Sequence, residues 1–149
     1  MEANFINPFL FSSVYVIESV IQIKPSIGKI KVSEIREIEN TLLLKIGIVG
    51  QIERDVLFGF PKYMIMKIVS KMMGGYTVTE YDEMCQSALA ELGNMITGNA
   101  SSMLMDEGYK VDITPPNIID DMTKYRGIKA FQIPLQIESI GEFNISITV

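Results

Sequence analysis

Residues 131–149 contain the pattern that most limits how this chain can fold, two apolar series that repeat at every second residue. The first series is Phe131, Ile133, Leu135 and Ile137, and the second, after a turn with Gly141, is Phe143, Ile145, Ile147 and Val149. Successive side chains of a strand point to opposite faces of a sheet, so each series lies on one face. The pattern predicts an antiparallel sheet with one buried face, which helices must cover.

The segments before this hairpin supply the rest of an α+β fold, a largely antiparallel β-sheet with long helices packed on one face. Asn7 and Pro8 are typical of a helix start, and Gly74, Gly75 and Gly108 are typical of helix ends. Strands are expected at 29–37, 41–50, 55–60 and 109–113. Helices are expected from position 8 to near Lys24 and Pro25, at 61–73 and at 81–105. We expect the loop around Asp120, Asp121 and Thr123 to be mobile or to face a partner.

Length and composition narrow the classes of function. At 149 residues the chain is expected to form one domain, residues 1–149, and its net charge of −5 argues against nucleic acid as a partner. It has no histidine and a single cysteine, Cys85, so it lacks an imidazole base, an internal disulfide and a thiolate metal site. We therefore predict no metal site and a cytoplasmic location. The N-terminus is apolar but has Glu2 where a signal peptide has basic residues. We interpret it as a core helix that neither spans a membrane nor serves as a signal peptide.

The predicted helix at 81–105 carries two stripes. Its core stripe consists of Cys85, Leu89, Leu92, Ile96 and Met103. The nearly opposite stripe consists of Ser87, Glu91, Asn94 and Gly98, which gather within about 60° on a helical wheel. A solvated polar face is the ordinary interpretation of such a stripe. However, Asn and two glycines weaken this helix, the glycines by about 1 kcal/mol each, and the centre of the stripe has no Lys or Arg to pair with Glu91.

These residues also match a known pattern. Ser87, then Glu91 four residues on, then Asn94 three further, resembles the active helix of the CheC, CheX and FliY group of bacterial chemotaxis phosphatases. INPF at 6–9, MMGG at 72–75 and the closing PLQIESIGEFNISITV at 134–149 are similar to that group in type and order, so the resemblance covers nearly the whole chain. A single copy of the motif, preceded by INPF, resembles the CheX branch, because CheC-like chains usually carry two copies.

The resemblance implies a function. Such proteins hydrolyse the phosphoaspartate of CheY, the response regulator that biases flagellar rotation, and they form homodimers. On this chain Asn94 would hold the attacking water in the regulator's active site, Glu91 would pair with the regulator's active-site lysine, and Ser87 would help to dock the helix. Gly98 would let the partner's loops approach closely. No cofactor of its own is expected, and Mg²⁺ would be held by the phosphorylated CheY.

The chemistry of these side chains agrees with that implication. An amide does not titrate usefully, so Asn94 can orient a water molecule but cannot act as a general base. Phosphoryl transfer needs mainly positioning and charge stabilisation, so the lack of histidine is no obstacle. The alternative is a non-catalytic adaptor or flagellar-switch module that binds a receiver domain through the same helix. A receiver domain itself is excluded, because the chain lacks an alternating βα pattern and an acidic pair after a first strand.

Overall fold

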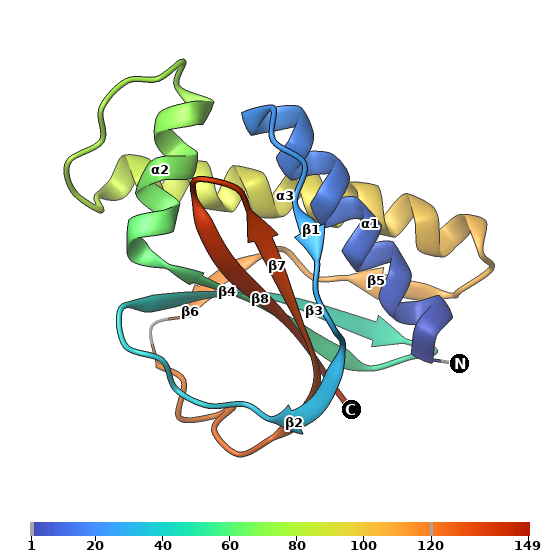
Figure 1. Cartoon of the computed structure of the whole chain (residues 1–149). Coiled ribbons are helices and arrows are strands. Elements are labelled where there is room, and N and C mark those ends of the chain that lie inside the picture. The colour runs from blue at the N-terminus through green and yellow to red at the C-terminus, as the bar shows by residue number, and fades with distance from the viewer. Residues whose placement is uncertain (1, 120) are drawn as a thin grey trace.

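The computed structural model of the chain describes residues 2–119 and 121–149. Figure 1 shows a twisted sheet with helices over one face, so the α+β fold with an antiparallel sheet is confirmed. The helices are α1 (Glu2–Ile21), α2 (Lys62–Met72) and α3 (Glu83–Asp106). The strands are β1 (Ser26–Ile27), β2 (Lys31–Glu34), β3 (Thr41–Gly50), β4 (Arg54–Pro61), β5 (Val111–Ile113), β6 (Asn117–Ile119), β7 (Lys129–Ile137) and β8 (Gly141–Thr148).

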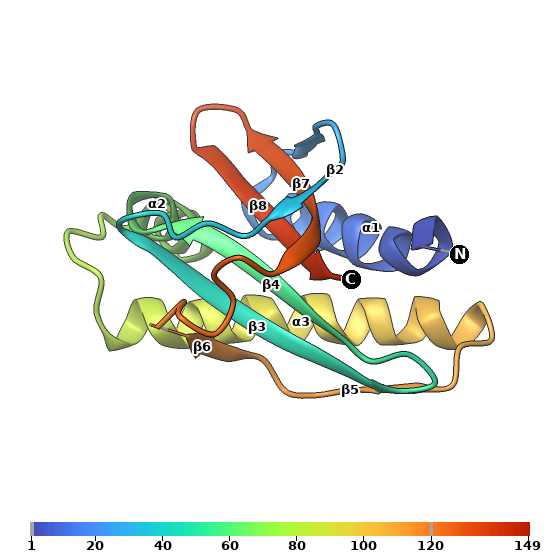
Figure 2. The ribbon, with the colours of Figure 1, turned by 90° about the horizontal axis from the view of Figure 1, so that it is seen from below.

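The strands form one sheet in the order β1-β7-β8-β4-β3-β5, with β2 also paired to β7 and β6 to β3. Every pairing among the described strands is antiparallel. The predicted closing hairpin is present, with Ile133 opposite Ile145, and β8 continues the sheet to β4, where Phe58 lies opposite Ile145. Figure 2, a view from below, shows the three helices together behind the strands.

The main core lies between the sheet and the helices. Phe60 and Phe143 stack there with ring centroids 4.7 Å apart, and Ile17 of α1 and Ile65 of α2 are buried in the same cluster. A smaller apolar cluster covers part of the opposite sheet face and consists of Ile35, Leu43, Leu57, Met122, Tyr125 and Ala130. This second cluster explains why neighbouring residues of β3, which point to opposite faces, are both buried.

The first helix begins earlier than the sequence predicted. It starts at Glu2 and contains Pro8, which was expected at its first turn, and it ends at Ile21, a few residues before the end expected near Lys24 and Pro25. Proline removes one helical hydrogen bond, but the extension buries Ile6 in the main core together with Phe9, and this burial offsets the lost bond. Over the part of the chain that the structure describes, no helix has the length and apolar character needed to cross a membrane.

The loop before β7, expected to be mobile or to face a partner, is exposed at Asp121 but packed on the sheet at other positions. Asp120 lies outside the described residues. Met122 and Tyr125 are buried in the second apolar cluster, on the sheet face opposite the helices. The Tyr125 hydroxyl donates a hydrogen bond to Asp55 Oδ2 at 2.8 Å. Burial, followed by this hydrogen bond and the negative charge of Asp55, raises the pKa of Tyr125 above its ordinary value. The loop is therefore part of the fold.

Candidate functional site

Helix α3 has a defined beginning and end. Asp82 precedes it in an extended conformation, and its carboxylate accepts a hydrogen bond from the Cys85 backbone N–H at 3.1 Å. Beyond the helix, Gly108 adopts a positive φ of 88°, and the Tyr109 N–H donates to the Leu104 carbonyl at 3.0 Å. Both ends thus have partners for backbone groups that a helix leaves unpaired.

One face of α3 is fixed against the rest of the molecule. Its buried residues are Cys85, Leu89, Leu92, Gly93, Ile96, Ala100 and Leu104. The helix contacts α1, α2, β3, β5 and β6, and Figure 2 shows β5 running along it. On the α1 side, the Ser12 hydroxyl donates to Asn99 Oδ1 at 3.3 Å. Met103, expected in the core stripe, is only partly buried. These contacts set the rotation of α3 about its axis.

The other face of α3 brings together all four site residues that the sequence singled out. Ser87, Glu91, Asn94 and Gly98 are exposed along one ridge of the helix. Within the described residues, the side chains of Glu91 and Asn94 have no hydrogen bond or ion pair. The carboxylate and the carboxamide are therefore free to bind a visiting molecule, one helical turn apart.

The two glycines of α3 have different surroundings. A Cβ on Gly93 would lie 2.8 Å from Leu44 Cδ2 and 3.0 Å from Pro116 Cβ, so close packing on β3 and on the segment before β6 requires glycine there. A Cβ on Gly98 would have no heavy atom within 4 Å. Packing within this chain therefore explains Gly93 and leaves Gly98 without an internal reason.

Sequence reasoning missed two further members of the ridge. Met84 and Met95 are 39% and 38% exposed, although methionine on a helix is usually a core residue. Their spacing from Glu91, seven residues before it and four after it, places them on the same helix face. That spacing is the signal that could have identified them. The ridge therefore combines polar groups with exposed apolar side chains.

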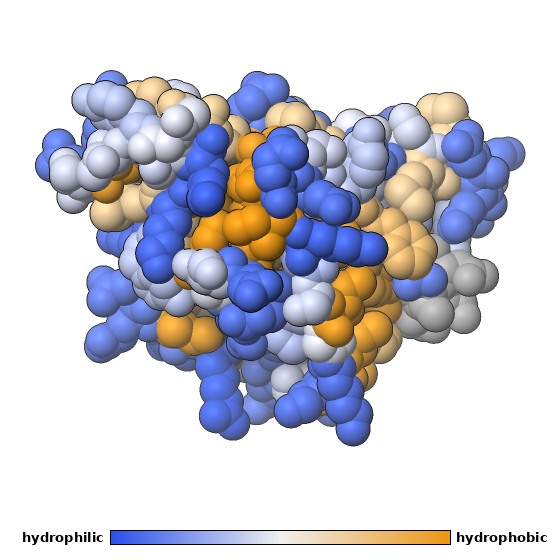
Figure 3. All heavy atoms as spheres, turned by 45° about the horizontal axis from the view of Figure 1, so that its top comes forward, coloured by the Kyte–Doolittle hydropathy of each residue, from blue (hydrophilic) through white to orange (hydrophobic). Residues whose placement is uncertain are grey.

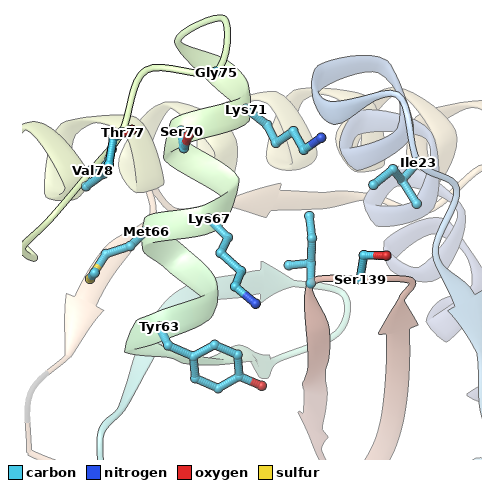
Figure 4. A pocket seen from close by; sticks show the side chains of 11 residues that line it. Ile23, Tyr63, Met66, Lys67, Ser70, Lys71, Gly75, Thr77, Val78 and Ser139 are labelled. Atoms are coloured by element: carbon cyan, nitrogen blue, oxygen red, sulfur yellow. The ribbon is translucent and has the colours of Figure 1, made fainter.

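The chain also contains a surface cavity, which lies beside α2 and away from the ridge of α3. A cavity of about 670 Å³ is lined by α2, the loop after it, the β7–β8 turn and Ile23. Figure 4 shows Lys67 and Lys71 extending from α2 into this region, with Ser139 across from them. Figure 3 shows apolar side chains exposed between hydrophilic ones on the face of the molecule that the helices cover. Glu91 and Asn94 do not line the cavity, so the ridge is suited to enter a pocket of another molecule and does not enclose a small substrate itself.

The arrangement of sheet and helices defines a CheC-like fold. The crystal structure of a CheC-like superfamily protein from Shewanella sp. PV-4 superposes with a TM-score of 0.82 at 27% sequence identity, covering 99% of this chain and 98% of that one. A crystal structure of a CheX-CheY-BeF3-Mg²⁺ complex from Borrelia burgdorferi gives a TM-score of 0.79 at 23% identity, covering 97% of this chain and 96% of that one.

Sequence comparison specifies the family within this fold. The model of the chemotaxis phosphatase CheX family matches residues 43–135. The CheY-P phosphatase CheX of Thermotoga maritima is 34% identical over 153 residues, covering 100% of this chain and 97% of that protein. The chain belongs to the chemotaxis phosphatase CheX family, and the resemblance noted in the sequence is confirmed.

Proposed function

We propose that this chain is a phosphatase that hydrolyses the phosphoaspartate of phosphorylated CheY. The observation that carries the proposal is the exposed pair Glu91 and Asn94, free of partners among the described residues and held on a helix whose other face is buried. The CheY-P phosphatase from Thermotoga maritima, similar over its full length, supports the substrate class. The Borrelia burgdorferi structure, in which a CheX protein is bound to CheY, supports the partner.

In this mechanism Asn94 enters the active site of the regulator and holds a water molecule in line with the phosphorus. Its amide oxygen accepts a hydrogen bond from the water, and its N–H₂ group can donate one. The transition state of phosphoryl transfer is loose, so positioning contributes much of the catalysis. A water molecule held by a rigid helix lowers the barrier by about 2–4 kcal/mol, roughly two to three powers of ten in rate.

The other ridge residues serve binding. Glu91 forms an ion pair with the active-site lysine of CheY, which orients the two proteins. Ser87 contributes polar contact one turn before Glu91, and Gly98 admits the partner's loops because nothing stands within 4 Å of where a side chain would begin. The Mg²⁺ that stabilises the phosphoryl charge belongs to CheY, and the chain supplies no cofactor of its own.

We also propose that the protein acts as a homodimer. The strand β2 lies at the edge of the sheet, all four of its residues are exposed, and Val32 presents 58% of its surface to solvent. An exposed edge strand offers unpaired backbone groups that a second copy can pair with across a two-fold axis. Light scattering on the purified chain should give twice the mass of one chain, and the mass of a single chain at micromolar concentration would exclude the dimer.

The phosphatase proposal is tested by following the phosphate of phosphorylated CheY with Mg²⁺ present. Catalytic amounts of the chain should shorten the lifetime of the phosphoryl group. The adaptor alternative predicts binding to CheY with an unchanged lifetime, so this one assay separates the two functions.

The role of Glu91 is tested by a matched pair of variants. Glu91→Gln should lower kcat/KM for phosphorylated CheY by about 30-fold or more, because the lysine of the partner loses its counter-charge at a desolvated contact. Glu39→Gln makes the same change at an exposed position in the turn before β3, outside α3, and should leave kcat/KM unchanged. Equal activity of the two variants would remove Glu91 from the mechanism.

A further inference from the structure

The ridge of α3 carries very little charge for a surface that binds another protein. The helix contains no Lys or Arg, and Glu91 is the single charged residue near the centre of the ridge. A desolvated ion pair adds little net affinity, because the cost of desolvating both charges offsets their attraction, although removing one partner leaves the other charge buried and unpaired. The charge of Glu91 can therefore orient a partner, but other contacts must supply most of the binding.

Exposed apolar surface is available on the same ridge. The exposed large apolar side chains of α3 among the described residues are all methionines: Met84, Met95 and Met105. On a helical wheel Met84 and Met95 lie within about 40° of Glu91, on the side away from Asn94. Met95 also precedes Asn99 by one turn, and Asn99 contacts Ser12, so this side of the ridge borders α1. The two methionines therefore form an apolar border next to the polar pair.

We propose that Met84 and Met95 form the apolar docking surface for the receiver domain of CheY and determine how tightly it binds. The inference rests on the proposed function. The partner at this surface is CheY, because the two methionines adjoin the residues that the proposed function places against it. When Asn94 reaches the phosphoaspartate of CheY, the same protein must also cover the adjoining turns of α3. Met84 and Met95 are separated along the axis by about 16 Å, well within the footprint of a protein interface.

The chemistry of methionine suits this contact. Its side chain is unbranched and polarisable, so it can adapt to the loops at the carboxyl ends of the strands, where a doubly wound domain such as CheY holds its ligands. Docking through methionine also leaves the amide of Asn94 free for the water. On this ridge the methionines therefore set the affinity for CheY, and Asn94 sets the rate of hydrolysis.

The test replaces Met84 and Met95 with Gln, singly and together. Glutamine keeps the length and the helix propensity of methionine but removes the apolar surface. The double variant should raise KM for phosphorylated CheY by about tenfold while kcat stays within about twofold of the parent. Its affinity for CheY loaded with beryllofluoride and Mg²⁺, which needs no turnover, should fall by the same factor.

Met73→Gln is the matched control. Met73 follows α2, lies outside the ridge and is 43% exposed, so this variant should match the parent in KM, kcat and affinity. A double variant with KM and affinity within twofold of the parent would overturn the inference, as would a loss confined to kcat. A parent chain that binds loaded CheY but does not shorten the phosphate lifetime would refute the phosphatase function, and the affinity measurement would still test the docking surface.

Discussion

The two faces of α3 differ in what their residues contact, although residues of one face are immediate neighbours of residues of the other in the sequence. Leu92 and Gly93 are buried against the rest of the fold, whereas Glu91 and Asn94, their immediate neighbours, are exposed and have no side-chain partner among the described residues. The buried face determines where the helix lies, and the exposed face presents the chemistry. Variants on the buried face should therefore change stability, and variants on the exposed face should change the reaction.

The largest change in stability is expected at Leu92. Leu92→Ala removes a side chain that is fully buried in the main core and leaves a cavity, so the free energy of unfolding should fall by about 2–5 kcal/mol. Urea unfolding measures this loss. In conditions where the variant remains folded, kcat should match that of the parent, and a kcat lowered in the folded protein would show that the two faces are not separable.

A smaller loss of stability is expected from a substitution at Gly93. In Gly93→Ala the new Cβ would come within 2.8 Å of Leu44 Cδ2 and 3.0 Å of Pro116 Cβ, so α3 must shift or Leu44 must change rotamer. Overpacking of this kind costs about 1–3 kcal/mol, which exceeds the gain in helix propensity from alanine. Thermal unfolding followed by circular dichroism tests the sign. A more stable variant would mean that close packing is not why glycine occupies position 93.

A third variant weakens the fold without touching α3. Tyr125→Phe removes the hydrogen bond to Asp55 and should lower stability by about 1–2 kcal/mol at neutral pH, with no change in kcat. The folded-state pKa of Tyr125 is raised, so its contribution is complete below the unfolded-state pKa of about 10 and is lost as the pH rises above it.

Unfolding of the parent and of Tyr125→Phe at about pH 9 and pH 11 measures this difference. The parent should lose more stability than the variant over that interval. Equal losses would show that Tyr125 does not supply the pH dependence.

The smallest change in stability is expected at Gly98, where the substitution should stabilise the protein. Gly98→Ala places a methyl group in open space, so the helix should gain about 0.5–1 kcal/mol from the better propensity of alanine. The same methyl group stands on the ridge and should lower kcat/KM for phosphorylated CheY severalfold. A variant that gains stability and keeps full kcat/KM would show that the partner does not approach Gly98 closely.

Local sequence pattern was sufficient for much of the fold. The strand at 41–50 agrees with β3 at both ends, and the alternation in 131–149 predicted the β7–β8 hairpin, because each pattern follows directly from burial of one or both sheet faces. The early start of α1 was not predictable from Asn7 and Pro8, since burial of Ile6 outweighs a local signal. Burial of Met122 and Tyr125 depends on a contact with the far sheet face, which no short segment reveals.

The candidate site shows the same limit. The spacing of Ser87, Glu91 and Asn94 predicted a shared helix face because the helical period alone decides it. The sequence could not distinguish Gly93 from Gly98, because the difference depends on Leu44 and Pro116, which lie far away in the chain. It also could not show which of the ten methionines would be exposed, since that follows from how α3 is rotated against its neighbours.

The central claim is that an exposed carboxamide positions the water while the buried face keeps the helix in place. Asn94→Ala tests it when phosphate release and unfolding are measured on the same preparation. Release from phosphorylated CheY should slow by about two to three powers of ten, and the free energy of unfolding should stay the same or rise slightly, because alanine is the better helix former. Full phosphatase activity in a folded Asn94→Ala protein would contradict the account.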